Sequence, residues 1–154
     1  MKMKIFIDGD GSPVKDTTIK LAEKYQLPVV IVTSVDHYTT KEYPDFVTFV
    51  YVDKGADSAD YKIVGLIQSG DILVTQDYGL ASLVLSKGVR VLHQLGNEYT
   101  KDTIETMLEQ RYFSAKLRKA GQRTKGPKAY TTEDRERFKE SLEKLIAQQA
   151  GDKK

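Results

Sequence analysis

The stretch MKIFIDGDGSP, residues 3 to 13, joins an apolar run to a turn that contains two aspartates. Residues 3 to 8 are typical of a buried strand. Ser12 followed by Pro13 predicts the N-cap and first turn of a helix that extends to about Gln26. The stretch therefore indicates the strand, turn and helix with which an α/β fold begins.

Four more strand patterns follow, and helical patterns separate most of them. Apolar, β-branched runs predict strands at 28–33, 46–52, 72–75 and 89–92. Capping residues and apolar spacing predict helices at about 56–70, 77–88, 100–119 and 131–148. This alternation predicts an α/β three-layer sandwich: a mainly parallel, five-stranded sheet with helices on both faces, followed by C-terminal helices.

The composition fits a single domain that spans residues 1–150. The 154 residues are 40% apolar, which is enough to bury one core. The chain has no cysteine, which excludes a disulfide framework and any Cys-based metal or redox site. No stretch approaches the roughly 20 apolar residues of a membrane span, and no long apolar signal region precedes the first aspartate. We therefore expect a cytoplasmic protein without a membrane partner.

Positive charge is concentrated in one segment, although the formal net charge is only +2. Residues 111–130 are expected to form a basic helix and loop, and no acidic residue interrupts 111–128. Such a segment is either a solvated face or a surface that neutralises the backbone phosphates of a nucleic acid. Its candidate phosphate-binding residues are Arg111, Lys116, Arg118, Lys119, Arg123, Lys125 and Lys128.

Five aspartates occupy positions that are expected at the carboxyl edge of the sheet. Ligands of parallel α/β sheets bind at this edge, near the switch in strand order. Converging carboxylates repel one another, and a divalent cation removes that repulsion. Oxygen ligands without thiols favour Mg²⁺ or Mn²⁺. The candidate metal ligands are Asp8 and Asp10 after the first strand, Asp57 and Asp60 in the helix after the third, and Asp77 after the fourth.

A cation in this position favours the hydrolysis of a phosphate ester, with Asp8 and Asp77 as the candidate catalytic residues. Asp8 needs a partner because it ends a central buried strand. Asp71 precedes its strand and is expected at the opposite edge, in a turn. Structural roles are alternatives for the other aspartates: an N-cap for Asp77, a first-turn residue for Asp57 and a turn residue for Asp10.

Several segments, taken in order, resemble the YaiI/YqxD family of uncharacterised bacterial proteins, and the resemblance covers nearly the whole chain. They are IDGDGSPVKD, KGADSADYKI, GDILVTQDYGLASLVLSKG, GNEYT, and RYFSAKLRKAGQRTKGP followed by TTEDRERF. The family is related to PIN-like nuclease domains, so the resemblance implies a PIN-like sheet. It also implies an acidic pocket in which Asp8, Asp57 or Asp60, and Asp77 match the acidic positions of PIN-type metal sites.

The first motif of this chain departs from the common family pattern. Where the family commonly has Asp-Ala-Asp-Ala-Cys-Pro, this chain has Asp-Gly-Asp-Gly-Ser-Pro at residues 8–13. Asp10 belongs to the family's own variant of this motif. Ser12 excludes a role that requires a thiolate. The resemblance thus implies metal-dependent phosphodiester hydrolysis, with RNA favoured over DNA as the substrate.

A second enzyme class also matches the first motif. IDGDGS resembles the first motif of haloacid-dehalogenase-type phosphatases, with Asp8 as the nucleophile and Asp10 as the general acid. That class keeps the carboxylates of its last acidic motif together after a strand. Here Asp71 and Asp77 lie on either side of a predicted strand, which argues against this alternative.

A non-catalytic nucleic-acid-binding module with an incomplete metal site is the third hypothesis. After the last predicted strand, Asn97 and Glu98 are the only candidates for a further acidic ligand. His37 and His93 also follow strands and are expected to border the same edge. They are interpreted as ordinary loop residues and not as metal ligands. RNA binding that persists without metal distinguishes this module from an enzyme.

Overall fold

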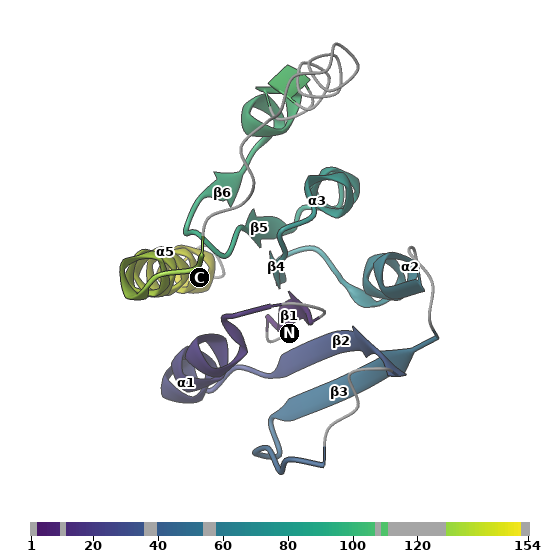
Figure 1. Ribbon diagram of the computed structural model, residues 1–154, viewed down its shortest axis with the longest axis vertical. Coiled ribbons are helices and arrows are strands. Elements are labelled where there is room, and N and C mark those ends of the chain that lie inside the picture. The colour runs from purple at the N-terminus through teal and green to yellow at the C-terminus, as the bar shows by residue number, and fades with distance from the viewer. Residues whose placement is uncertain are drawn as a thin grey trace.

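The computed structural model describes residues 3–9, 12–35, 40–53, 58–106, 109–110 and 129–151. Within these residues one six-stranded sheet has the order β3-β2-β1-β4-β5-β6 (Figure 1). The first five strands are parallel, and β6 pairs with β5 in the antiparallel direction. The strands are β1 (Ile5–Asp8), β2 (Val29–Ser34), β3 (Val47–Val52), β4 (Ile72–Val74), β5 (Arg90–Leu92) and β6 (Glu98–Tyr99).

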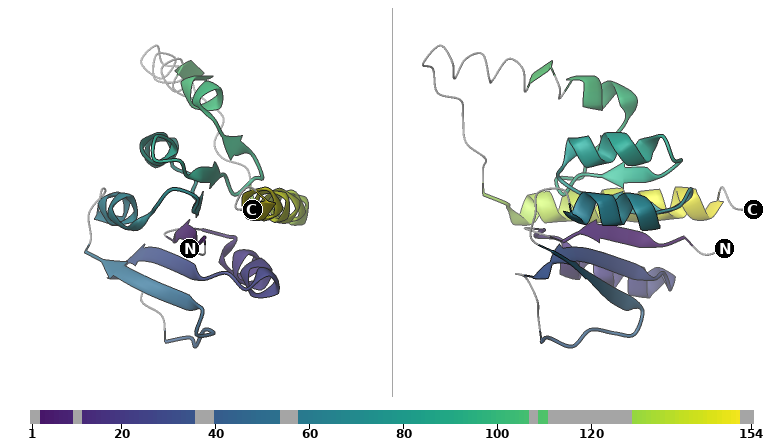
Figure 2. Two further views of the ribbon diagram at one scale, coloured as in Figure 1. Left: turned by 180° about the vertical axis from the view of Figure 1, so that it is seen from behind. Right: turned by 90° about the vertical axis from the view of Figure 1, so that its right-hand side faces the viewer.

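Helices cover both faces of the sheet, as Figure 2 (left) shows. One face carries α1 (Lys15–Tyr25) and α5 (Thr132–Gly151), and the other carries α2 (Ser58–Leu66) and α3 (Tyr78–Leu85). A further helical segment spans residues 101–106. The three-layer α/β sandwich is therefore confirmed, and no described helix has the length and apolar character needed to cross a membrane.

Side chains of the buried strands alternate between the two helical layers. Ile5 and Ile7 pack on the face covered by α1 and α5, while Phe6 between them packs against the layer of α2 and α3. Successive side chains of a strand point to opposite faces, so a strand covered on both faces is apolar throughout. This explains why the strands appear in the sequence as continuous apolar runs.

The strand order places the switch point of the sheet between β1 and β4. From β1 the chain proceeds through α1 to β2 and then β3, and α2 returns it past β1 to β4. Ile7 of β1 lies beside Val74 of β4, so the carboxyl ends of these two strands are adjacent. The residues directly after β1 and β4 therefore meet at this position.

The boundaries of α1 and α2 differ from the predicted ones. α1 begins at Lys15, and Val14 is the N-cap without a side-chain capping bond. Ser12 is therefore not the N-cap: its Oγ accepts a bond from the N–H of Val14 at 3.4 Å and closes a short turn before the helix. α2 ends at Leu66 rather than at Gly70, because the chain turns before β4.

Asp71 holds that turn at the amino edge of the sheet, as predicted. Its side chain is only 6% exposed. Oδ1 accepts from the N–H of Lys4 at 3.0 Å, and Oδ2 accepts from the N–H of Gln68 at 2.9 Å. Asp71 thus ties the end of α2 to the residues that enter β1, far from the carboxyl edge.

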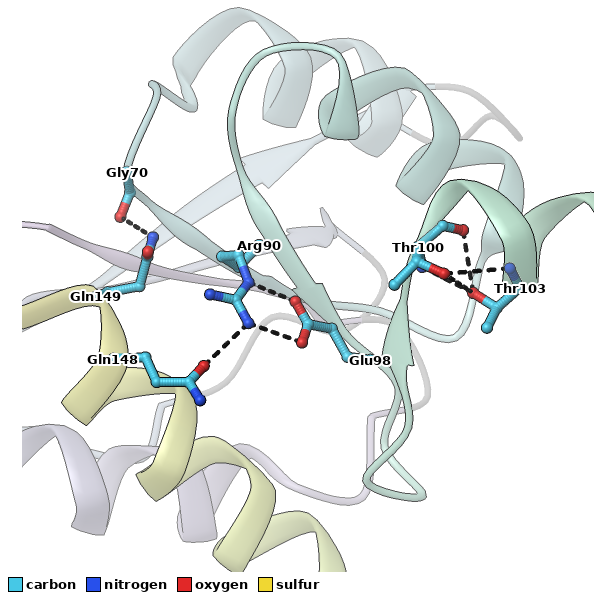
Figure 3. A network of polar contacts seen from close by, with 7 residues as sticks. All are labelled: Gly70, Arg90, Glu98, Thr100, Thr103, Gln148 and Gln149. Atoms are coloured by element: carbon cyan, nitrogen blue, oxygen red, sulfur yellow. Dashed lines mark hydrogen bonds and ion pairs between the residues drawn. The ribbon is translucent and has the colours of Figure 1, made fainter. Parts of the chain in front are cut away.

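The C-terminal part of α5 is also attached to the amino edge (Figure 3). Arg90 of β5 forms an ion pair with Glu98 of β6, in which Nη2 donates to Oε1 at 2.8 Å. Nη2 also donates to Oε1 of Gln148 at 3.1 Å, and Nε2 of Gln149 donates to the carbonyl of Gly70 at 3.0 Å. α5 is therefore fixed to the sheet and is part of the same sandwich.

β6 is a strand that the sequence did not predict. It contains two residues, Glu98 and Tyr99, opposite Leu92 and Val91. A two-residue strand carries no detectable alternation of apolar and polar side chains. The predicted five-stranded sheet is thus complete, and β6 adds a short antiparallel edge to it.

Candidate active site at the carboxyl edge

Asp8 ends β1 at the switch point and is held there by Thr75. Oγ1 of Thr75 donates a hydrogen bond to Oδ2 of Asp8 at 2.9 Å. Asp8 is half-buried, and Thr75 is only 3% exposed. A half-buried carboxylate needs a donor to replace water, and the residue directly after β4 supplies one.

Thr75 also connects Asp8 to the turn that leads into α3. Its Oγ1 accepts a hydrogen bond from the backbone N–H of Asp77 at 3.0 Å. A hydroxyl has one donor and two acceptor positions, so Thr75 serves both partners at once. Sequence reasoning missed this residue; the available signal was a hydroxyl directly after a buried strand and two residues before the candidate acid Asp77, in VTQD.

Asp77 caps α3, which confirms its structural alternative. Its Oδ1 accepts from the N–H of Gly79 at 2.8 Å and from the N–H of Leu80 at 3.2 Å. Within the described part of the chain, no hydrogen bond reaches its Oδ2. The cap therefore orients Asp77 and leaves one carboxylate oxygen for another ligand.

Gly9 brings the chain close to β2 immediately after Asp8. Its N–H donates to the carbonyl of Val32 at 2.8 Å. A Cβ at this position would lie only 2.8 Å from Cγ2 of Ile31 and 3.1 Å from Cβ of Thr33. A Cβ would force Ile31 to shift, so this close approach favours glycine at the first glycine position of the motif in this chain.

Asp60 lies in the first turn of α2, at the same edge as Asp8. α2 connects β3 to β4 and runs against the direction of the parallel strands, so it begins at their carboxyl ends. Asp60 is half-buried on the helix face that also carries the buried Ile63 and Ile67. This placement agrees with the predicted spacing of the helix.

The other predicted site residues lie outside the described residues. Within the part of the chain that the structure describes, no three acidic or histidine side chains are close enough together to hold a metal ion. The predicted site residues outside that part are Asp10, Asp57, His37 and the basic set Arg111, Lys116, Arg118, Lys119, Arg123, Lys125 and Lys128.

His93 and Tyr99 form a partly buried pair beside this edge. The rings meet edge-on with centroids 5.9 Å apart. Nδ1 of His93 accepts from the N–H of Leu95 at 3.0 Å, and burial lowers the pKa of His93. The neutral ring therefore carries its proton on Nε2. Burial, with a smaller contribution from the charge of Asp77, raises the pKa of Tyr99 well above its ordinary value, so Tyr99 stays neutral.

A narrow crevice surrounds Asp8. In this conformation the crevice is too small to admit a water molecule. The carbonyl of Gln94, at the rim of the crevice, accepts a hydrogen bond from Oη of Tyr130 at 2.7 Å. This bond attaches the residue just before α5 to the carboxyl edge of the sheet. The crevice is lined by Asp8, Ser12, Val74, Thr75, Gln76 and Gln94.

A mainly parallel sheet between two helical layers, with an aspartate at its switch point, defines an α/β protein with an acidic candidate site. Within that class the chain belongs to the YaiI/YqxD family, because the family described as "Uncharacterized BCR, YaiI/YqxD family" matches residues 6–148. This confirms the resemblance seen in the sequence. The relationship to PIN-like domains and the nuclease activity stay predictions.

Related proteins cover almost the same length. The chain is 66% identical over 144 residues to a UPF0178 protein of Enterococcus faecalis, covering 94% of this chain and 97% of that protein. It is 54% identical over 145 residues to a UPF0178 protein of Bacillus cereus, covering 94% of this chain and 99% of that protein. No solved structure gives a significant match.

Proposed function

We propose that this protein is a divalent-metal-dependent phosphodiesterase that acts on a nucleic acid, with RNA favoured over DNA. The observation that carries the proposal is the chain of hydrogen bonds from Asp8 through Thr75 to the backbone of Asp77. It holds two acidic residues at the switch point, where α/β sheets bind their ligands. The basic segment 111–128 supplies cations for the nucleic-acid backbone.

The oxygen donors at this edge fit a hard cation. Asp8 and Asp77 offer carboxylates, and Asp60 begins α2 at the same edge. Mg²⁺ and Mn²⁺ prefer such oxygen ligands, and Asp10 and Asp57 would complete the set. When bound, the cation supplies Lewis-acid polarisation of a phosphoryl oxygen.

Asp8, Thr75 and Asp77 have different roles in the proposed reaction. Asp8 provides the negative charge at the switch point, and Thr75 fixes the orientation of that carboxylate. The cap on α3 orients Asp77 through its Oδ1. Its Oδ2 can then accept a hydrogen bond from a ligand or from an attacking water. Thr75 is a positioning residue, because it acts through Asp8 and Asp77.

A titration with Mn²⁺ and a cleavage assay on labelled RNA test the proposal together. The double variant Asp8→Asn, Asp77→Asn is expected to lose metal binding and cleavage, because both carboxylates become neutral amides. The matched control is Asp45→Asn, Asp102→Asn, which neutralises two exposed aspartates away from this edge. Equal metal binding by wild type and the Asp8, Asp77 variant contradicts the proposed site.

The non-catalytic binding module is the second candidate, favoured by the narrowness of the crevice beside Asp8. It predicts RNA binding with a steep salt dependence in EDTA and no cleavage when Mg²⁺ or Mn²⁺ is added. Cleavage that disappears in the Asp8, Asp77 variant and persists in the control rejects this candidate.

The phosphatase alternative finds less support in the structure. Asp71 lies at the amino end of β4, where two backbone N–H groups occupy its carboxylate. Asp77 lies after the other end of the same strand. That class predicts an aspartyl phosphate on Asp8, so a beryllofluoride adduct of Asp8 detected by NMR would replace the nuclease proposal.

A further inference from the structure

A groove of about 400 Å³ runs between α1 and α5 on the outer surface of the sandwich. The two helices lie side by side on the same face of the sheet (Figures 1 and 2). α1 contributes Lys20 and Lys24 to the groove, and α5 contributes Arg135 and Lys139. Two acidic side chains, Glu136 and Glu143, also line it, so the lining has a net positive charge.

Helical spacing places the four cations in two facing rows. Lys20 and Lys24 are four residues apart on α1, and Arg135 and Lys139 are four residues apart on α5. Residues at this spacing lie on the same helix face, roughly 6 Å apart along the axis. Each wall therefore presents two positive groups along the direction of the groove.

The protein neutralises only part of this charge. Nζ of Lys24 pairs with Oε2 of Glu143 at 2.7 Å, and the same oxygen accepts from Oη of Tyr25 at 2.8 Å. Lys20 and Lys139 form no ion pair with the residues that the structure describes. Lys24 and Glu143 therefore close one end of the groove, while the other cations stay available.

Among the described residues, Arg135 contacts an aromatic ring and forms no ion pair with a carboxylate. Its guanidinium lies over the ring of Tyr130, 5.7 Å from the centroid. A planar guanidinium held on an aromatic face keeps its N–H donors for an anion such as a phosphate. With Lys20 and Lys139, Arg135 gives the groove three cations for an external anion.

The groove begins at the same edge as the candidate active site. Thr17 and Arg135 lie near the starts of α1 and α5, and α1 starts directly after the β1 turn. Tyr130, just before α5, is bonded to Gln94 at the rim of the Asp8 crevice. A chain-like ligand that lies along the groove would therefore extend toward Asp8.

We propose that this α1–α5 groove binds the phosphate backbone of a single-stranded nucleic acid, with Lys20, Arg135 and Lys139 as the phosphate contacts. A groove of about 400 Å³ with cations on both walls suits a single nucleic-acid strand, whose backbone can follow a positively charged groove. The nucleic acid is favoured over an acidic peptide because the basic segment 111–128, without any acidic residue, precedes α5 in the sequence. The inference rests on the proposed function only for the identity of the polyanion, since backbone binding needs neither metal nor cleavage.

The test measures fluorescence anisotropy of a labelled oligouridine of about 20 nucleotides, in EDTA, across a range of salt concentrations. The variant Lys20→Glu, Lys139→Glu is expected to bind at least about tenfold more weakly. Its salt slope is expected to fall by about 1.4, because each lost phosphate contact on a single strand contributes about 0.7. The variant Lys20→Gln, Lys139→Gln is expected to show a smaller loss, with circular dichroism confirming that both variants are folded.

The matched control is Lys62→Glu, Lys144→Glu, which makes the same charge change on α2 and on α5 outside the groove. It is expected to bind within about twofold of wild type, because net charge alone gives only non-specific attraction. Equal losses in the control and in the groove variant overturn the assignment. Displacement of the RNA by polyglutamate at equal charge concentration overturns the choice of nucleic acid.

A cleavage assay with Mg²⁺ separates this inference from the proposed function. Groove-dependent binding without any cleavage supports the groove and rejects the phosphodiesterase. If the Lys20→Glu, Lys139→Glu variant cleaves RNA at the wild-type rate and with the wild-type substrate affinity, the groove assignment is rejected and the phosphodiesterase proposal is retained.

Discussion

Thr75 gives the candidate site its rigidity. Its hydroxyl donates to Asp8 and accepts from the backbone of Asp77, so one buried side chain joins the ends of β1 and β4. The two partners of this hydroxyl are an ionisable carboxylate and a backbone N–H. Removing the hydroxyl takes the Thr75 hydrogen bond from Oδ2 of Asp8 and takes the side-chain acceptor from the N–H of Asp77.

Thr75→Val is therefore expected to lower the free energy of unfolding by about 1–3 kcal/mol. Valine has nearly the same shape as threonine, so the loss reflects the missing hydrogen bonds and not a cavity. Urea unfolding followed by circular dichroism measures the change. Thr75→Ser keeps the hydroxyl and serves as the control, and a valine variant as stable as wild type would contradict the role assigned to Thr75.

Asp8 and Asp71 show what single residues reveal before the fold is known. Each aspartate is adjacent to a buried strand, but Asp8 follows its strand and Asp71 precedes its own. Because parallel strands share one direction, this difference alone placed them at opposite edges, and the structure confirms both positions. Thr75 was missed because a hydroxyl after a strand has many ordinary uses.

α5 is the element whose sequence signals are confirmed most completely. The N–H of Asp134 donates to Oγ1 of Thr131 at 3.0 Å, and Oδ2 of Asp134 accepts from the N–H of Thr131 at 3.0 Å, which forms a capping box. Four apolar side chains at helical spacing are buried: Phe138, Leu142, Leu145 and Ile146. The helix extends to Gly151, beyond the predicted end at 148.

The cap of α5 predicts a pH dependence of stability. The backbone N–H of Thr131 is the main cause that holds the pKa of Asp134 below its usual value of 3.8. A depressed carboxyl pKa stabilises the folded state above the unfolded pKa, and this contribution is lost as the pH falls through the folded pKa. Asp134→Asn is therefore expected to lower Tm at about pH 6 but not at about pH 2.5. Thermal unfolding at both values measures the difference, and an equal Tm change at both would contradict the capping role.

α1 shows the limit of capping signals. Ser12 and Pro13 predicted the correct helix, but the first helical residue is Lys15. Ser12 closes a turn onto Val14 instead, since the chain must first leave the crowded end of β1 at Gly9. The position of the helix was thus a local property, whereas its first residue depended on the neighbouring strand.

The sandwich as a whole depends on α5 as much as on the sheet. Phe138 is fully buried in the cluster that contains Ile5, Ile31 and Leu92, so the last helix completes a core formed by the first strands. Phe138→Ala is expected to lower the free energy of unfolding by about 3–5 kcal/mol, because it leaves a cavity in this core. Denaturant unfolding measures the loss. Leu83→Ala, at a side chain that is 56% exposed, is the control and is expected to change stability by less than about 1 kcal/mol.

Local patterns in the chain were enough to establish the three layers, the five parallel strands, and the edges at which Asp8 and Asp71 lie. They succeeded because alternation, helical spacing and strand direction depend on neighbouring residues. The strand order, the bond between Asp8 and Thr75, and the groove between α1 and α5 needed the folded chain. Asp8 and Thr75 are 67 residues apart, and Lys24 and Glu143 are 119 apart. No local pattern encodes such contacts, because they arise only when crossovers and helices pack on one sheet.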